Sequence, residues 1–301
     1  MANLSINSNV TALSAQRNLS RTTLELSKTF QRLSSGKRIN SAADDAAGLA
    51  VASSLKAQIR GLNQAERNVQ DGIAMLQVAE GAISEISDAM QRMRELAVQA
   101  ASDTVNDDER ASIDLEFTAL AVEIANILDS TEYNGTVLMG DGAGAAQANA
   151  FILQVGSNNG DTLTVTLGTI MNSAVNGVDL TSLDLSSQAN AATAITDLDT
   201  AISGTATGAS TTTATTLVVG NGESITGYQS AIGAAINRLE LIASNLGSQR
   251  ENMEIGYSNV MDADIASETT SLTRSAILQQ AATAVLAQAN QQPQLALQLL
   301  A

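Results

Sequence analysis

Carboxylates are the side chains best suited to chemistry in this 301-residue chain, because the sequence contains no histidine and no cysteine. Cysteine nucleophiles, histidine general bases and the usual zinc ligand sets are therefore excluded. Two carboxylates could still hydrolyse a glycosidic bond if they converged in a pocket about 5–9 Å apart. The acidic residues of the middle region that would have to supply such a pair are Asp141, Asp161, Asp179, Asp184, Asp197, Asp199 and Glu223.

The surroundings of these carboxylates do not suit a glycosidase. They lie among Gly, Thr, Ser, Ala and Asn, and the whole chain has three Phe, three Tyr and no Trp to stack on a sugar. Asp44 and Asp45 have a simpler explanation, because carboxylates favour the start of a helix. The sequence predicts a protein that is not an enzyme, with no catalytic residue, no metal and no cofactor.

The charge distribution points away from nucleic acid. The net charge is −16, yet residues 1–60 carry eight Lys/Arg against three Asp/Glu, and no acidic residue follows Glu268. No window approaches the ~20 apolar residues of a membrane span. The first ten residues, MANLSINSNV, have neither the basic nor the apolar part of a cleavable signal peptide. Secretion, if it occurs, is expected to use another route.

A heptad pattern over residues 62–100 organises the elements. Every seventh residue is apolar, and a second small or apolar residue follows three positions later. A continuous helix of this length would extend about 58 Å, so it needs other long helices as partners. Residues 113–128 and 225–260 have matching patterns. The predicted seam residues are Leu62, Val69, Leu76, Ile83 and Met90, and Ile225, Ile232, Leu239, Leu246 and Met253.

The rest of the chain is less regular. Residues 1–35 have a weak amphipathic pattern, and Pro293 is expected to limit the last helix. On the helix over 113–128, the predicted apolar stripe is Ile113, Phe117, Leu120, Ile124 and Ile127. FILQV and TLTVTL predict a β-hairpin near 151–167, and residues 188–202 predict a helix. Residues 204–216 are predicted to form an exposed loop.

The expected fold is mainly α: long antiparallel heptad helices form a coiled-coil rod from both chain termini, with a small β-hairpin and a short irregular middle. Such a narrow assembly cannot bury the apolar end of the chain, LALQLLA. Self-association of many copies would bury it, and head-to-tail contacts build an open helical polymer.

Long segments at both ends resemble bacterial flagellin. They are QRLSSGKRINSAADDAAGLAVASSL (31–55), GLNQAERNVQDGIAMLQVAEGAISEI (61–86), QRMRELAVQA (91–100) and SAILQQAATAVLAQANQQPQLALQLL (275–300). The resemblance implies a structural subunit that self-assembles into the flagellar filament for motility, outside the cell. Residues 1–45 and 262–301 would form the inner tube of the filament. Residues 46–187 and 225–261 would form a rod domain, and 188–224 an exposed helix and insertion.

The resemblance also implies partners. The subunit would be exported unfolded through the flagellar type III apparatus, with an export chaperone on about 262–301, and would meet the filament cap and hook-associated proteins. Some flagellins are recognised by a Toll-like receptor, and Arg92, Leu96 and Glu116 match that motif. Arg92 and Leu96 are four residues apart and off the Leu62 seam, so both are expected on an outer face that also makes subunit contacts.

Two other interpretations remain open. A hook–filament junction protein would share the terminal architecture, but it should not form long homopolymers. A surface protein displayed on a coiled-coil stalk would also use the heptad helices. The context around Asp44 and Asp45 and the long C-terminal match favour flagellin over both.

Overall fold

The computed structural model describes residues 9–139, 149–167, 174–175, 178–180, 182–204, 216–219 and 224–298. The chain divides into two compact units. Met1–Ile59 and Glu251–Ala301 form one, here called the terminal unit, and Arg60–Arg250 form the other, the central unit. Two long helices, α2 (Ala46–Ala100) and α5 (Ile225–Met261), contribute residues to both. The predicted division into tube and rod segments concerns the filament and stays a prediction.

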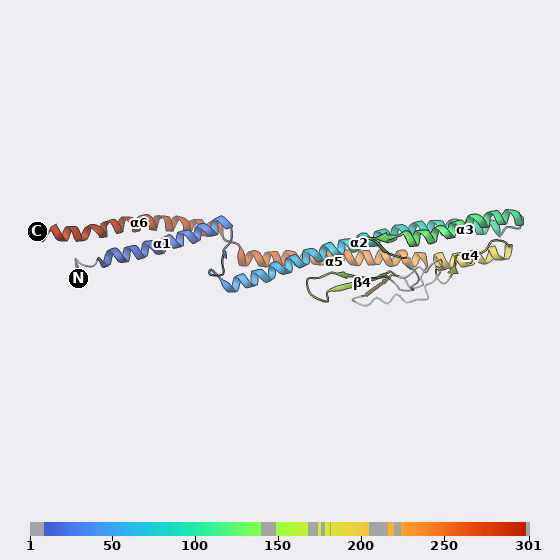
Figure 1. The fold of residues 1–301 in the computed structure, drawn as a ribbon, viewed down its shortest axis with the longest axis horizontal. Helices are drawn as coiled ribbons and strands as arrows, with labels where there is room; N and C mark the ends of the chain where they lie inside the picture. Colours follow the sequence, from blue (N-terminus) through green and yellow to red (C-terminus); the bar gives the residue numbers. More distant parts are fainter. Residues whose placement is uncertain are drawn as a thin grey trace. The chain divides into compact units, whose positions relative to one another are not determined.

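The terminal unit contains an antiparallel pair of helices, α1 (Val10–Ser35) and α6 (Ile265–Gln298), which lie side by side (Figure 1). The chain leaves α1 at Gly36, whose φ of +69° is the left-handed conformation that ends many helices. The two chain ends are then joined by backbone hydrogen bonds: the Ala263 N–H donates to the Gly36 oxygen (3.0 Å) and the Arg38 N–H to the Met261 oxygen (2.6 Å). The predicted pairing of the first and last helices is confirmed.

A small apolar cluster joins the parts of α2 and α5 that belong to the terminal unit. Ile39, Ala52 and Met261 are buried there. The start of α2 is fixed by Asp45, whose carboxylate accepts a hydrogen bond from the Gly48 N–H at 2.8 Å. The predicted role at the helix start is therefore confirmed for Asp45, whereas Asp44 accepts hydrogen bonds from the Ser41 N–H and hydroxyl in the preceding turn.

The central unit is built on the heptad seam. From Leu62 to Met90 and from Ile225 to Leu246, every predicted seam residue is at most 4% exposed, whereas Met253 is only half-buried. An ion pair also links the two helices, because Arg250 Nη1 lies 2.8 Å from Glu66 Oε2. Alanine and glycine at the second heptad position, such as Ala65 and Gly72, are buried too. Small residues there let the backbones approach closely.

The third long helix, α3 (Asp107–Ser130), begins at a capping box of Asn106 and Glu109 and runs beside α2 (Figure 1). The predicted stripe on α3 is partly wrong. The buried apolar residues are Phe117, Ala121, Ile124 and Leu128, whereas Ile113, Leu120 and Ile127 are only half-buried. These four residues follow one another at helical spacing over about three turns. Ala121 belongs to the buried face because of its position in the helix, although its side chain is small.

The β-structure is small. β3 (Asn149–Gln154) and β4 (Thr162–Leu167) form the predicted antiparallel hairpin. β7 (Thr216–Val219) pairs with β4 in parallel, which the sequence analysis did not predict. β1 (Glu132–Tyr133) and β2 (Thr136–Val137) close a tight turn at Asn134 and Gly135, both with positive φ. β5 (Ala174–Val175) and β6 (Val178–Asp179) form a third pair.

The remaining predictions have mixed outcomes. The helix expected over 188–202 is α4 (Gln188–Ser203), which begins at an Ser187 cap. The prediction that Pro293 limits the last helix is wrong, because α6 continues to Gln298. The expected loop over 204–216 falls mostly on 205–215, outside the described residues. The mainly helical fold class is confirmed. No helix in the described part of the chain is long and apolar enough to cross a membrane.

Candidate assembly interface

The α1–α6 pair exposes large apolar side chains. Two paired helices share one interface, so their other faces meet solvent. The exposed residues are 49–65% accessible and are here called the terminal apolar surface: Val10, Leu13, Leu24 and Phe30 on α1, and Ile265, Ile277, Leu278 and Val285 on α6. When large apolar side chains gather on one exposed surface, that surface is normally covered by another molecule.

The buried contacts within the same helix pair are small. Among the side chains of α1 and α6 that the structure describes, the buried ones are Ala15, Thr29, Ser275 and Ala289. Because burial stabilises in proportion to apolar area, this thin interface contributes little. A groove of about 280 Å³ beside it is lined by charged groups that include Lys28, Arg32 and Glu268. One ion pair crosses it, with Arg32 Nη1 3.3 Å from Glu268 Oε1. The helix pair therefore buries less apolar surface than the seam of the central unit.

Two of the three residues predicted for receptor recognition lie together on the central unit. Arg92 Nη2 of α2 lies 2.9 Å from Glu116 Oε1 of α3, and Arg92 Nη1 lies 3.0 Å from Glu95 Oε2. The hydrogen bonds that Arg92 donates to the Glu116 carboxylate, followed by the one that it donates to Glu95, raise the pKa of Arg92. Both partners of the Arg92–Glu116 pair are half exposed, so solvent screens the attraction and the pair adds little stability.

Leu96 does not lie on that surface. It is 2% exposed, so the expectation that Arg92 and Leu96 share an outward face is wrong. A separation of four residues turns an α-helix by about 40° beyond a full turn, which is enough to carry Leu96 from the edge into the interface. Of the three residues predicted for receptor recognition, only Arg92 and Glu116 are therefore exposed, and Leu96 belongs to the buried core of the central unit.

A second ion pair was missed by the sequence analysis. Arg94 of α2 binds Asp199 of α4 through two contacts, one of them from Nη2 to Oδ2 at 3.3 Å. Hydrogen bonding to Arg94 lowers the pKa of Asp199 and raises that of Arg94. The two residues are 105 positions apart, and no local pattern links them.

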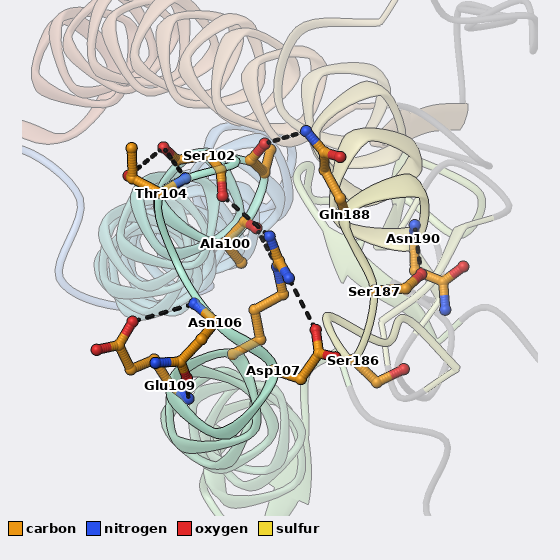
Figure 2. A network of polar contacts seen from close by, with 12 residues as sticks. Ala100, Ser102, Thr104, Asn106, Asp107, Glu109, Ser186, Ser187, Gln188 and Asn190 are labelled. Carbon is orange, nitrogen blue, oxygen red and sulfur yellow. Dashed lines mark hydrogen bonds and ion pairs between the residues drawn. The ribbon is translucent and has the colours of Figure 1, made fainter.

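The turn between α2 and α3 contains a buried guanidinium, also missed. Figure 2 shows the Ala100 and Ser102 carbonyls and the Asp107 carboxylate around it. Arg110 Nε donates to the Ala100 oxygen (2.9 Å), Nη2 to the Ser102 oxygen (3.0 Å) and Nη1 to Asp107 Oδ1 (2.9 Å). Arg110 thus caps the end of α2, where carbonyls lack helical donors. Arg110 precedes the buried Phe117 by seven residues, and this heptad spacing could have indicated that Arg110 lies on the buried face of α3.

Three of the carboxylates first considered for catalysis, Asp161, Asp184 and Asp199, have structural partners. Asp161 accepts a hydrogen bond from the Asn158 N–H in the hairpin turn (3.1 Å). Asp184 precedes α4 and accepts from the Ser186 hydroxyl (2.7 Å), which lowers the pKa of Asp184. Asp141, Glu223 and the side chain of Asp179 lie outside the described residues. In the part of the chain that the structure describes, no group of three or more acidic residues could hold a metal.

Long helices that join both chain ends and leave apolar surface on the terminal pair define a class of structural, self-associating subunits. The model of the bacterial flagellin N-terminal helical region matches residues 6–143, and that of the C-terminal helical region matches residues 215–300. The chain belongs to the bacterial flagellin family: it is a structural, non-enzymatic subunit of the flagellar filament, which serves motility.

Full-length relatives agree with this assignment. A flagellin of Halalkalibacterium halodurans is 40% identical over 98% of this chain and 99% of its own length. A flagellin of Bacillus subtilis is 38% identical over the same shares. A solved chain from Vibrio parahaemolyticus, described as flagellar hook-associated, matches 73% of this chain and 100% of its own, with a TM-score of 0.57 and 14% identity. At that identity the last match concerns the fold alone.

Proposed function

We propose that copies of this chain polymerise by burying the terminal apolar surface of α1 and α6 against neighbouring copies. The observation that carries the proposal is the exposure of eight large apolar side chains on a helix pair whose own interface is small. Covering such side chains contributes on the order of 1 kcal/mol each. The sum is comparable with the cost of immobilising a subunit, about 4–15 kcal/mol, so assembly requires most of them together.

Truncation and electron microscopy test this proposal. The full chain, a chain lacking residues 1–45 and a chain lacking 262–301 are each mixed with short filament fragments, and elongation is followed by light scattering. The full chain should elongate the fragments, and neither truncation should, although both should keep the helicity of the central unit by circular dichroism. Filaments of normal length from a truncated chain would refute the assignment of the ends.

The export route and its partners form a second part of the proposal. The chain is exported unfolded through the flagellar type III apparatus, and an export chaperone binds about 262–301 before export. The exposed Ile277, Leu278 and Val285 of α6 support this, because a chaperone that covered them would also prevent premature assembly. The cap and hook-associated proteins would meet the same terminal surface. The chaperone should bind the full chain and fail to bind a chain lacking 262–301.

Receptor recognition of the monomer is assigned to the Arg92–Glu116 pair. Its support is the family motif together with the half-exposed positions of both side chains. Arg92→Ala and Glu116→Ala should weaken signalling through a flagellin-sensing Toll-like receptor without changing the melting temperature. Arg94→Ala, which removes a neighbouring exposed arginine paired with Asp199, is the matched control and should signal normally. Unchanged signalling from both test variants would contradict the assignment.

A junction protein between hook and filament is the alternative that the sequence left open, and the Vibrio chain described as hook-associated shares the fold without indicating the function. The two functions predict different polymer lengths. A filament subunit elongates seeds without limit, whereas a junction protein adds only a short segment. Length distributions from the seeding experiment therefore decide between them.

A further inference from the structure

Asn9 joins the start of α1 to α6 through both ends of one side-chain amide. Its Oδ1 accepts a hydrogen bond from the Ala12 N–H at 3.0 Å, which caps α1. Its Nδ2 donates to the Ala289 carbonyl oxygen at 2.8 Å, 280 residues away in the chain. The residue that caps the first helix therefore also contacts the last one.

The Ala289 carbonyl differs from its neighbours because of Pro293. In an α-helix the oxygen of residue 289 accepts from the N–H of residue 293, and proline has none. Ala289 is 7% exposed, so its oxygen has little access to water as a substitute donor. An unpaired buried carbonyl is unfavourable. The Asn9 amide supplies the missing donor, at a site where α6 continues through the proline to Gln298.

The opposite end of the helix pair is fixed by the hydrogen bond from the Ala263 N–H to the Gly36 oxygen. Along the chain, 27 positions separate Asn9 from Gly36 and 26 separate Ala263 from Ala289. Both helices rise 1.5 Å per residue, so the two spans match and both ends can be joined at once. Between them, the buried contacts are small side chains such as Ala15 and Ser275, which specify the relative position of the helices weakly.

We propose that Asn9 is a positioning residue that sets the register of α1 against α6 by recognising the donor-free carbonyl created by Pro293. A slip of one helical turn would move the partners about 5.4 Å apart and break the hydrogen bond. The register also decides which α1 and α6 side chains stand next to each other on the terminal apolar surface. The inference rests on the proposed assembly through that surface.

Two substitutions separate the capping role from the donor role. Asn9→Ser and Asn9→Asp both keep a good helix cap but lose the Nδ2 donor. Each should raise the critical concentration for filament growth about five- to tenfold, with Asp the worse because its carboxylate faces a carbonyl oxygen. Asn18→Asp makes the same chemical change at an exposed position of α1 and should stay within about twofold of the parent.

Replacing the proline tests the mechanism. Pro293→Ala restores a backbone donor to the Ala289 oxygen, so in that background Asn9→Ser should change the critical concentration less than about twofold. A loss of the same size in both backgrounds would overturn the proposal. Pro293→Gln, which also restores the N–H, repeats the test with a second side chain. If neither proline variant assembles, the test rests on Asn9→Ser and Asn9→Asp in the parent chain. Critical concentrations within about twofold of the parent, as expected for Asn18→Asp, would then overturn the proposal.

The result is distinguishable from failure of the proposed assembly. If the parent chain forms no filaments, the assembly proposal itself fails. If the parent and all Asn9 variants form filaments at the same critical concentration, assembly stands and the positioning role of Asn9 alone is wrong.

Discussion

The terminal and central units use helices of similar kind in opposite ways. In the central unit, several helices surround the seam, and residues such as Leu76 and Ile83 are completely buried. In the terminal unit, two helices meet through small residues, and Leu24 and Ile277 remain exposed. Burial thus depends on how many elements pack around a helix rather than on its apolar content. We therefore expect the central unit to be stable within one chain and the terminal unit to gain stability from contacts with other copies.

The strongest test of this difference places one substitution in each unit. Ile83→Asn puts an amide into a fully buried seam and should destabilise the central unit by about 4 kcal/mol. Ile277→Asn changes an exposed residue, so monomer stability should move by less than about 0.5 kcal/mol, but the critical concentration should rise about tenfold. Urea unfolding of the monomer and sedimentation of filaments measure the two effects. If Ile277→Asn filaments grow normally, the terminal apolar surface is not the contact.

The second test concerns the buried guanidinium at the α2–α3 turn. Arg110→Met keeps much of the volume but leaves the Ala100 and Ser102 carbonyls without their donors. We expect a loss of about 2–3 kcal/mol in the free energy of unfolding. Arg67→Met replaces an exposed arginine of the same α2 helix and should change stability by less than about 0.5 kcal/mol. Equal effects of the two substitutions would mean that the Arg110 contacts add nothing.

The third test uses two glycines of α2 that should respond with opposite signs. A Cβ on Gly72 would lie 2.5 Å from Leu153 Cδ1 of β3, so Gly72→Ala forces the Leu153 side chain out of its position and should cost about 1 kcal/mol. A Cβ on Gly81 meets nothing within 4 Å, so Gly81→Ala should stabilise by up to about 1 kcal/mol through helix propensity. Thermal melting of both variants measures the difference. Stabilisation by both would show that the hairpin does not pack closely on α2.

Sequence reasoning succeeded where a periodic pattern was long. The seams of α2 and α5 repeat over several heptads. The predicted seam residues are buried from Leu62 to Met90 on α2 and from Ile225 to Leu246 on α5. It failed where one residue or a distant partner decides. β7 is four residues long and pairs with a strand about 50 positions earlier. Leu96 is buried although Arg92, four residues earlier on α2, is half exposed, because four residues turn the helix about 40° beyond a full turn. Proline normally ends a helix, but α6 continues past Pro293, and the Asn9 amide donates to the Ala289 oxygen that Pro293 cannot pair with.

The smallest expected effect comes from the Arg94–Asp199 ion pair, which links α2 to α4 within the central unit. Arg94 lowers the pKa of Asp199 below its ordinary value of 3.8 in the folded chain. The unfolded chain therefore binds a proton more readily, so the pair stabilises the fold above the ordinary pKa and loses its effect as pH falls through the lowered one. Both side chains are about half exposed, so the contribution is small and screened by salt.

Asp199→Asn should remove this acid dependence. At neutral pH and low salt its melting temperature should fall slightly below that of the parent, and the gap should close as pH drops below about 3.8 or as salt is added. Asp197→Asn on the same helix is the matched control for the loss of one negative charge. If both variants lower the melting temperature equally, net charge rather than the contact to Arg94 is responsible. A gap that widens in acid would contradict the sign of the pKa shift. Because neither residue belongs to the terminal apolar surface, the critical concentration for assembly should change far less in these variants than in Ile277→Asn.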